Sequence, residues 1–394
     1  MSLLVGWIIF IAALLISITL HEAGHLVAAK RFGMKATQFF AGFGPTLWSR
    51  QKGETEYGIK AVPLGGFVKI IGMTSLEDVE PDDEPRSLRS KPGWQRVIVL
   101  AAGSFTHFVL AAALLFGLFL GVGLANQNTT KIGVVDRCLP RSQTASCTAS
   151  DPRSPAHAAG LHADDKIVSF AGKPVRSWND LVAAIRGHRP GSVVSVTVRR
   201  GGQLLTVNAK LAAIKGRSGA FLGISPAVVY GHVGPIQAVK STGSFIGTVV
   251  TSSAGVITEL PKAIPKLFAH NRADTAGGKV TSIVGAGDAT GQVIGAKIGW
   301  RQKVTITVLI VASLNIFVGL FNLLPLLPLD GGHIAVVLYE RARAYVARLR
   351  RRPDPGLVDM RKLVPVSFGI FAVLIFIGLM LIMADLVNPV SIIQ

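Results

Sequence analysis

The sequence predicts a polytopic α-helical membrane protein of about four transmembrane helices, with membrane-associated β-hairpins and one inserted α+β domain. Its composition is apolar, since 49% of the 394 residues are hydrophobic and the mean hydropathy is +0.48. Four long runs also lack Asp, Glu, Lys and Arg, namely Met1–Leu20, 97–130, Val304–Leu329 and Leu363–Ala384. A helix needs about 20 apolar residues to cross a bilayer, so each run is long enough. Between the second and third runs, strand and turn patterns indicate a water-soluble domain.

From these runs we expect eight segments along the chain. In order they are a first transmembrane helix (1–30), a cytoplasmic, membrane-associated β-hairpin region with an acidic loop (31–96), a second transmembrane helix (97–126), an extracytoplasmic α+β domain (127–214), extracytoplasmic helices at the membrane surface (215–302), a third transmembrane helix (303–332), a basic cytoplasmic loop (333–362) and a fourth transmembrane helix (363–388). The first run has no basic segment before it and no small-residue cleavage site after it. We therefore interpret it as a retained helix and not as a secretion signal.

Lys and Arg are concentrated in two of these segments. The formal net charge is +19, and the basic residues are dense between 30 and 96 and again between 341 and 362. Short loops rich in Lys and Arg stay cytoplasmic, whereas long domains translocate largely regardless of charge. Both termini and the segment 127–302 are therefore expected outside the cell. Nucleic-acid binding is not expected, because the arginines between 348 and 352 lack the aromatic partners that stack on bases.

The end of the first run carries two histidines and a glutamate at membrane depth, in the sequence Leu20-His21-Glu22-Ala23-Gly24-His25. On a helix, His21 and His25 project from nearly the same face, one turn apart. Two such imidazoles can share one Zn²⁺, and Glu22 on the flank can take a proton from water at the metal. Polar side chains buried in an apolar span are costly and are functional candidates by default. The pattern indicates a zinc protease whose active site lies inside the bilayer.

Alternating apolar residues with glycines at the turns predict β-hairpins between Phe39 and Ile70. Strands are tolerated at membrane depth only where their edges are covered or line a polar cavity. One interpretation is that an unpaired edge near Gly44 or Gly66 lies beside the protease site, so that an extended substrate adds to it as a strand. The other is a cytoplasmic hairpin that rests on the lipid surface.

The second span carries the small and polar residues Gly103-Ser104-Phe105-Thr106-His107. Glycine and small hydroxyl residues allow helices to pack closely in membranes. His107 is a third histidine at membrane depth and could be a metal ligand, a substrate contact or a partner in a hydrogen bond between helices. We favour the hydrogen bond.

Residues 131–214 show the pattern of a compact α+β module. The expected strands and helix are Lys131–Val135, Asp165–Phe170, Trp178–Arg186 (helix), Val193–Arg199 and Gln203–Lys210. The stretch Ala158–Val168 followed by Ala171–Val175 resembles the bacterial PDZ domain, in which a groove between a strand and a helix takes up extended chains. The alternative is a domain that only blocks bulky substrates sterically.

The two cysteines, Cys138 and Cys147, both fall in the segment expected outside the cell. An oxidising compartment permits a disulfide that closes a short loop, and this is our prediction. Two free thiols are the alternative.

The third span ends in a second candidate segment, Asn322-Leu323-Leu324-Pro325-Leu326-Leu327-Pro328-Leu329-Asp330-Gly331-Gly332-His333. A catalytic zinc usually has three protein ligands, and no third ligand follows His25 on the first helix. Asp330 is the outstanding candidate, because proline and glycine interrupt the helix there and let the carboxylate turn toward a partner. The alternative for Asp330 is a helix cap. Asn315 and Asn322 lie on one face of this span and are suited to holding a peptide backbone, or to hydrogen bonding between helices.

Taken together, His21-Glu22-Ala23-Gly24-His25 and Leu329-Asp330-Gly331 resemble the two signatures of the site-2 proteases. Further matches are Phe43-Gly44-Pro45 and Pro63-Leu64-Gly65-Gly66-Phe67-Val68-Lys69. Four spans around one PDZ-like insert are similar to the group of these proteases that includes the actinobacterial Rip metalloproteases. The resemblance implies a bacterial plasma-membrane enzyme that cleaves transmembrane segments of single-span proteins, often anti-sigma factors, in regulated intramembrane proteolysis.

One departure from the family concerns the second span. Many relatives have Gly-Pro-x-x-Asn where this chain has Gly103-Ser104-Phe105-Thr106-His107, so the substrate role of that asparagine is not carried over to His107. Two other functions are kept as rivals. A zinc-handling transporter would need further charged residues within the spans, and the sequence has almost none. A membrane scaffold with a PDZ-like domain and a non-catalytic metal would bind partners without cleaving them.

Overall fold

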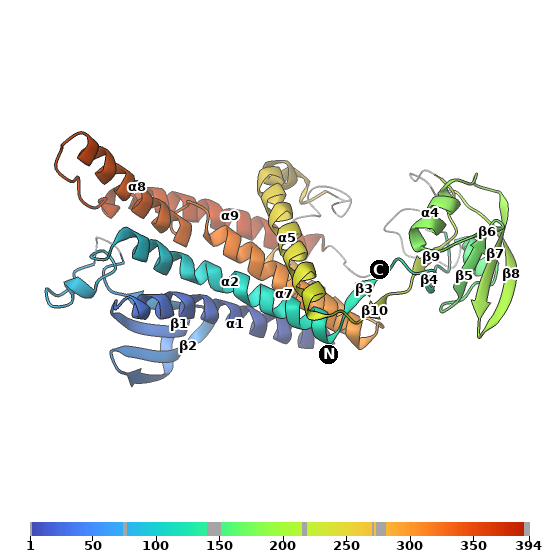
Figure 1. Ribbon diagram of the computed structural model, residues 1–394, viewed down its shortest axis with the longest axis horizontal. Coiled ribbons are helices and arrows are strands. Elements are labelled where there is room, and N and C mark those ends of the chain that lie inside the picture. The colour runs from blue at the N-terminus through green and yellow to red at the C-terminus, as the bar shows by residue number, and fades with distance from the viewer. Residues whose placement is uncertain are drawn as a thin grey trace. The chain divides into compact units, whose positions relative to one another are not determined.

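Four helices of the described chain are long and apolar enough to cross a membrane: α1 (Ser2–Arg31), α2 (Gly93–Gly121), α7 (Trp300–Asn322) and α9 (Val364–Val387). This confirms the predicted class of polytopic helical membrane protein. The computed structural model describes residues 2–73, 77–139, 151–214, 219–269, 272 and 281–389. The chain forms two units, one made of Met1–Leu120 with Gly234–Gln394 and the other of Gly121–Val233. In the first unit, the long helices run alongside one another and the β1–β2 sheet lies next to α1 (Figure 1).

Among the residues that the structure describes, three further helices and short 3₁₀ turns belong to the first unit. They are α5 (Pro235–Ala263), α6 (Ile283–Gly295) and α8 (Asp330–Leu349), and the turns are η1 (Glu84–Arg86), η2 (Ile264–Lys266) and η5 (Met360–Lys362). Helix α6 packs on the N-terminal part of α1, where a Cβ at Gly6 would lie 2.6 Å from the backbone nitrogen of Gly291. The indole of Trp7 donates to Asp288 Oδ1 at 2.9 Å across the same contact. Helix α1, which carries the histidines, is therefore held by α6 at one end.

The predicted β-hairpins form one bent sheet from β1 (Ala36–Lys52) and β2 (Thr55–Ile70). Phe40 is paired with both Phe67 and Gly58, so the first part of β1 lies between the two parts of β2. The chain can bend back in this way because Gly42 and Gly44 adopt φ angles of +91° and +81°, which glycine reaches without a steric penalty. Within the described residues, the last part of β2 pairs on one side only and is an edge that faces α1.

The second unit has the predicted α+β composition, and we call it the PDZ-like unit after the resemblance in its sequence. Its elements are β3 (Leu124–Asn126), β4 (Ile132–Val135), α3 (Pro155–Ala158), β5 (Lys166–Phe170), β6 (Lys173–Pro174), α4 (Trp178–Arg186), β7 (Val193–Arg200), β8 (Gln203–Lys210), β9 (Ile224–Pro226) and β10 (Val229–Gly231). The largest sheet has the order β6-β5-β7-β8, while β4 pairs with β9 and β3 with β10. The apolar residues that alternate along β5 and β7 meet Leu181 of α4 in one core.

A salt bridge ties β7 to the start of β5. Arg200 donates to both carboxylate oxygens of Asp165 at 2.7 Å, and Asp165 also accepts from the backbone amide of His162. Burial by itself raises the pKa of the Asp165 carboxyl, but these hydrogen bonds and the guanidinium charge outweigh it and hold the pKa below its ordinary value.

Two segments differ from the expected boundaries. Helix α8 covers Asp330–Leu349, where we expected the third span to end and a basic loop to begin, and α7 ends at Asn322. Helix α8 forms because its partly buried face packs against the rest of the first unit while Arg341 and Arg348 stay exposed. A high density of charge therefore did not mean a loop. The PDZ-like unit also extends past 214 to Val233, because β9 and β10 pair with β4 and β3.

Candidate metal centre

The histidine pair lies on the inner face of α1. His21 and His25 are 8% and 5% exposed, and they are one helical turn apart, as their spacing predicted. Their Nε2 atoms face each other at 3.2 Å. Because burial removes these rings from water, their nitrogen atoms need hydrogen-bond partners or a metal.

The third side chain comes from the first residue of α8. Asp330 follows an irregular segment, 323–329, in which Pro325 and Pro328 prevent α7 from continuing. This segment folds back tightly on the start of α8, because a Cβ at Gly332 would lie 2.6 Å from the carbonyl carbon of Leu326. The two glycines after Asp330 therefore allow the turn that brings its carboxylate to α1.

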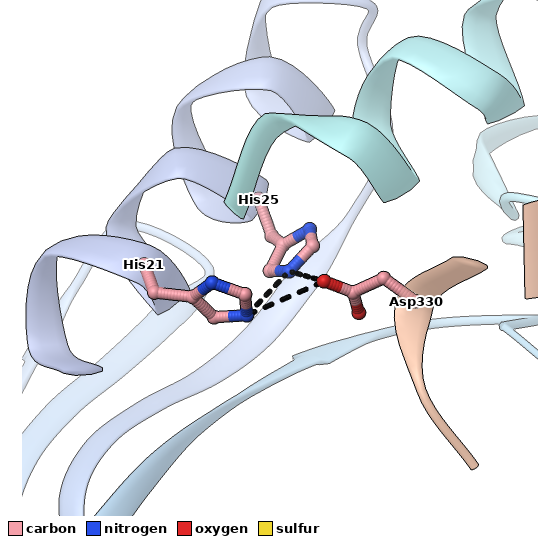
Figure 2. Close-up of side chains that lie close together, drawn as sticks. All are labelled: His21, His25 and Asp330. Atoms are coloured by element: carbon pink, nitrogen blue, oxygen red, sulfur yellow. Dashed lines mark hydrogen bonds and ion pairs between the residues drawn. The ribbon is translucent and has the colours of Figure 1, made fainter. Parts of the chain in front are cut away.

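The three side chains converge on one point (Figure 2). Asp330 Oδ2 is 3.4 Å from His21 Nε2 and 3.5 Å from His25 Nε2. Tetrahedral zinc with bonds of about 2.0 to 2.2 Å separates its ligand atoms by about 3.3 to 3.6 Å, so the observed separations of 3.2, 3.4 and 3.5 Å fit that ion. In the described part of the chain, this is the group of three whose ligand atoms lie close enough to hold a metal.

Neighbouring groups orient two members of this cluster. The carbonyl of Val99 can only accept a hydrogen bond, so Nδ1 of His25 donates to it at 2.7 Å and Nε2 keeps its lone pair for a metal. Ser104, which is fully buried, donates to Asp330 Oδ2 at 3.5 Å. Both partners come from α2. From the sequence, Ser104 was recognised only as a small packing residue, although a hydroxyl inside an apolar run was a usable signal.

Glu22 lies beside the edge of the sheet. Its Oε2 accepts a hydrogen bond from the backbone amide of Val68 at 3.1 Å. A Cβ at Gly66 would lie 3.5 Å from Glu22 Cγ, so the glutamate and the edge of β2 are in direct proximity. Nothing in the sequence pattern indicated the Val68 amide, because a backbone donor carries no residue signature.

The other expected site residues lie in different settings. Asn315 is 2% exposed and accepts from Nδ1 of His107 at 2.8 Å, so His107 forms the hydrogen bond between helices that we favoured. Asn322 is the last residue of α7. Gly44 lies in the bend of β1, where its carbonyl accepts from Lys60 at 3.3 Å.

Cys138 is buried, but Cys147 lies outside the described residues, so the disulfide stays a prediction.

The chain is similar to known proteins over most of its length. The family model described as Peptidase family M50 matches residues 9–352. The chain is 32% identical over 425 residues to the zinc metalloprotease Rip1 of Mycobacterium bovis, with 100% of both chains covered. It is 35% identical over 423 residues to Rip1 of Mycolicibacterium smegmatis, with 99% of both covered. A solved PDZ domain of an SdrC-like protein from Listeria monocytogenes is 24% identical and covers 25% of this chain and 90% of its own, with a TM-score of 0.18. The family match and the two full-length relatives establish that the chain belongs to peptidase family M50, the site-2 proteases.

Proposed function

We propose that this chain hydrolyses peptide bonds within transmembrane segments of single-span membrane proteins, anti-sigma factors among them, in regulated intramembrane proteolysis and transmembrane signalling. Its family and its full-length relatives make it a zinc metalloendopeptidase of a bacterial membrane. The observation that carries the proposal is the convergence of His21, His25 and Asp330 on one point, with Glu22 beside it and a strand edge next to Glu22.

In this proposal His21, His25 and Asp330 hold the zinc. When bound, zinc polarises the scissile carbonyl and makes water available as hydroxide near neutral pH. Glu22 accepts the proton of the attacking water on Oε1, while its Oε2 stays bonded to the Val68 amide. Glu22 then delivers that proton to the nitrogen of the leaving amine. The Val68 amide thereby orients the carboxylate throughout the reaction.

The substrate helix must unwind locally, because a carbonyl bonded within a helix is shielded from attack. We propose that the unwound segment adds as a strand to the edge of β2 at Gly66, where the missing side chain leaves room beside Glu22. Gly44 belongs to the bend that shapes the same sheet. Asn322 and Asn315 are proposed to bind the substrate backbone, and for Asn315 this requires its bond to His107 to open.

The proposed orientation places both termini and the PDZ-like unit outside the cell. The density of Lys and Arg in 30–96 and 341–362 supports it, because these segments match the short cytoplasmic loops of the positive-inside rule. The lipid bilayer is then a binding partner of the enzyme and surrounds its transmembrane helices. No nucleic acid is involved.

The decisive experiment incubates the purified, zinc-loaded protein in lipid vesicles with a single-span substrate and compares wild type with Glu22→Ala. Cleavage is expected to fall by more than about 10³-fold, since general-base catalysis contributes up to about 10⁴-fold, while zinc content is retained. Glu259→Ala, which removes an exposed carboxylate of α5, serves as the matched control and should cleave normally. Equal cleavage by wild type and Glu22→Ala would contradict the proposal. Zinc transport without cleavage would favour a transporter, and substrate binding without cleavage a scaffold.

A further inference from the structure

Besides Val99 and Ser104, the second membrane helix contacts the metal centre at the backbone of Gly103. Gly103 of α2 is buried against both imidazoles. A methyl group at this position would lie 2.7 Å from Cε1 and 2.8 Å from Nε2 of His21, and closer still to Nε2 of His25. Non-bonded heavy atoms are at their optimal separation at about 3.5 to 4.0 Å. An added carbon would therefore clash with the Nε2 atoms of both histidines, which face Asp330.

The surroundings leave the imidazoles little room to yield. His25 is tied to α2 itself, because its Nδ1 donates to the Val99 carbonyl one turn before Gly103. Helices α1 and α2 are also in contact at a second glycine, since a Cβ at Gly24 would lie 2.6 Å from the Ala102 carbonyl oxygen. A side chain at 103 could be accommodated only by separating the helices or by turning the rings away from Asp330.

We propose that Gly103 is a positioning residue of the metal centre: the ion enters because no side chain projects from this position of α2. Helix α2 is then a wall of the site alongside α1 and α8. The inference rests on the proposed function, since it assumes that His21, His25 and Asp330 hold the zinc. Helix propensity does not explain a glycine at position 103, because alanine is favoured over glycine inside a helix by about 1 kcal/mol.

The test compares Gly103→Ala with Gly117→Ala in the full-length protein. Gly117 lies on the same helix, is exposed, and has no atom within 4 Å of its Cβ position in the described part of the chain. Both variants gain the same methyl group and the same helix propensity. Zinc per chain is measured after equilibration in zinc buffers, the visible spectrum is recorded after cobalt substitution, and the unfolding temperature is followed with and without a chelator.

We expect Gly117→Ala to match wild type in all three measurements. Gly103→Ala should bind zinc more than about 100-fold more weakly, beyond the 10- to 100-fold cost typical of groups that only support a ligand. It should lack the cobalt spectrum, and it should unfold at the temperature of chelator-treated wild type without further response to the chelator.

Zinc retained by Gly103→Ala at the wild-type level would overturn the inference and leave the proposed function untouched. Unfolding of Gly103→Ala well below chelator-treated wild type would also overturn it, since the loss of zinc would then follow from lost helix packing. Absence of zinc from wild type itself would instead defeat the proposed function.

Discussion

Replacing Arg272 by methionine removes one half of the most deeply buried ion pair in the described part of the chain. Arg272 Nη2 and Asp385 Oδ1 are 2.7 Å apart, and their side chains are 0% and 2% exposed. Arg272 also donates to the Asn388 carbonyl at 3.0 Å, while Asp385 accepts from the Ser282 amide at 2.6 Å and from the Thr281 hydroxyl at 3.1 Å. These bonds join the end of α9 to the start of α6, the helix that packs on α1.

The cost of the substitution follows from burial. Removing one partner of a buried pair leaves an uncompensated charge and costs about 3 to 5 kcal/mol. Exposed pairs contribute only about 0 to 1 kcal/mol. Lys131 and Asp164 are 2.8 Å apart but 45% and 83% exposed, so this pair has nearly the same separation and offers the matched control.

The free energy of unfolding is measured by chemical denaturation in mixed micelles for Arg272→Met and Lys131→Met. We expect a loss of about 3 to 5 kcal/mol for the first and less than about 1 kcal/mol for the second. The double variant Arg272→Met/Asp385→Asn should recover part of the loss, because a neutral amide oxygen still accepts from Ser282. Equal losses for Arg272→Met and Lys131→Met would refute the reasoning.

Three further predictions concern the metal centre and the PDZ-like unit. Ser104→Ala should weaken zinc binding by about 10- to 100-fold, because it removes the hydroxyl that contacts Asp330. Titration in zinc buffers measures this affinity, and an unchanged affinity would exclude a role for Ser104 in zinc binding. Chelation should abolish cleavage and added zinc should restore it, whereas activity that persists without metal would contradict the assigned chemistry. Arg200→Gln should destabilise the fold by about 1 to 2 kcal/mol, less than for a fully buried pair because Arg200 is one-third exposed. The lowered pKa of Asp165 means that this contribution is present above about pH 4, the ordinary Asp value, and is lost as pH falls further. Hydrogen exchange of the β5 and β7 amides at pH 7 and pH 3 should therefore show a smaller difference between wild type and variant at pH 3, and a constant difference would disprove the link.

Strong local patterns predicted the long helices and the paired histidines. An apolar run without charged residues predicts a transmembrane helix by its length alone. The four-residue spacing of His21 and His25 places both side chains on the same face of that helix. Asp330 was also predicted, since proline and glycine around it marked the end of a helix. These features depend on short stretches of chain, so sequence alone was sufficient.

Several features that depend on contacts between distant segments were not predicted. The pairing of β9 with β4 and of β10 with β3 extends the second unit beyond the expected boundary, and no local alternation reveals which strands pair. The hydrogen bond from the Val68 amide to Glu22 involves a backbone group that every residue except proline carries. The contact of Gly103 with both imidazoles likewise depends on how closely α2 approaches α1.

X-ray absorption at the zinc edge tests the metal centre most directly. The spectrum of the wild-type protein should show two imidazole nitrogens and one carboxylate oxygen at about 2.0 to 2.2 Å. His21→Ala should remove one imidazole from the spectrum, and Asp330→Ala should remove the carboxylate. Sulfur neighbours at about 2.3 Å, or a zinc environment that neither substitution changes, would contradict the assignment of His21, His25 and Asp330 as the ligands.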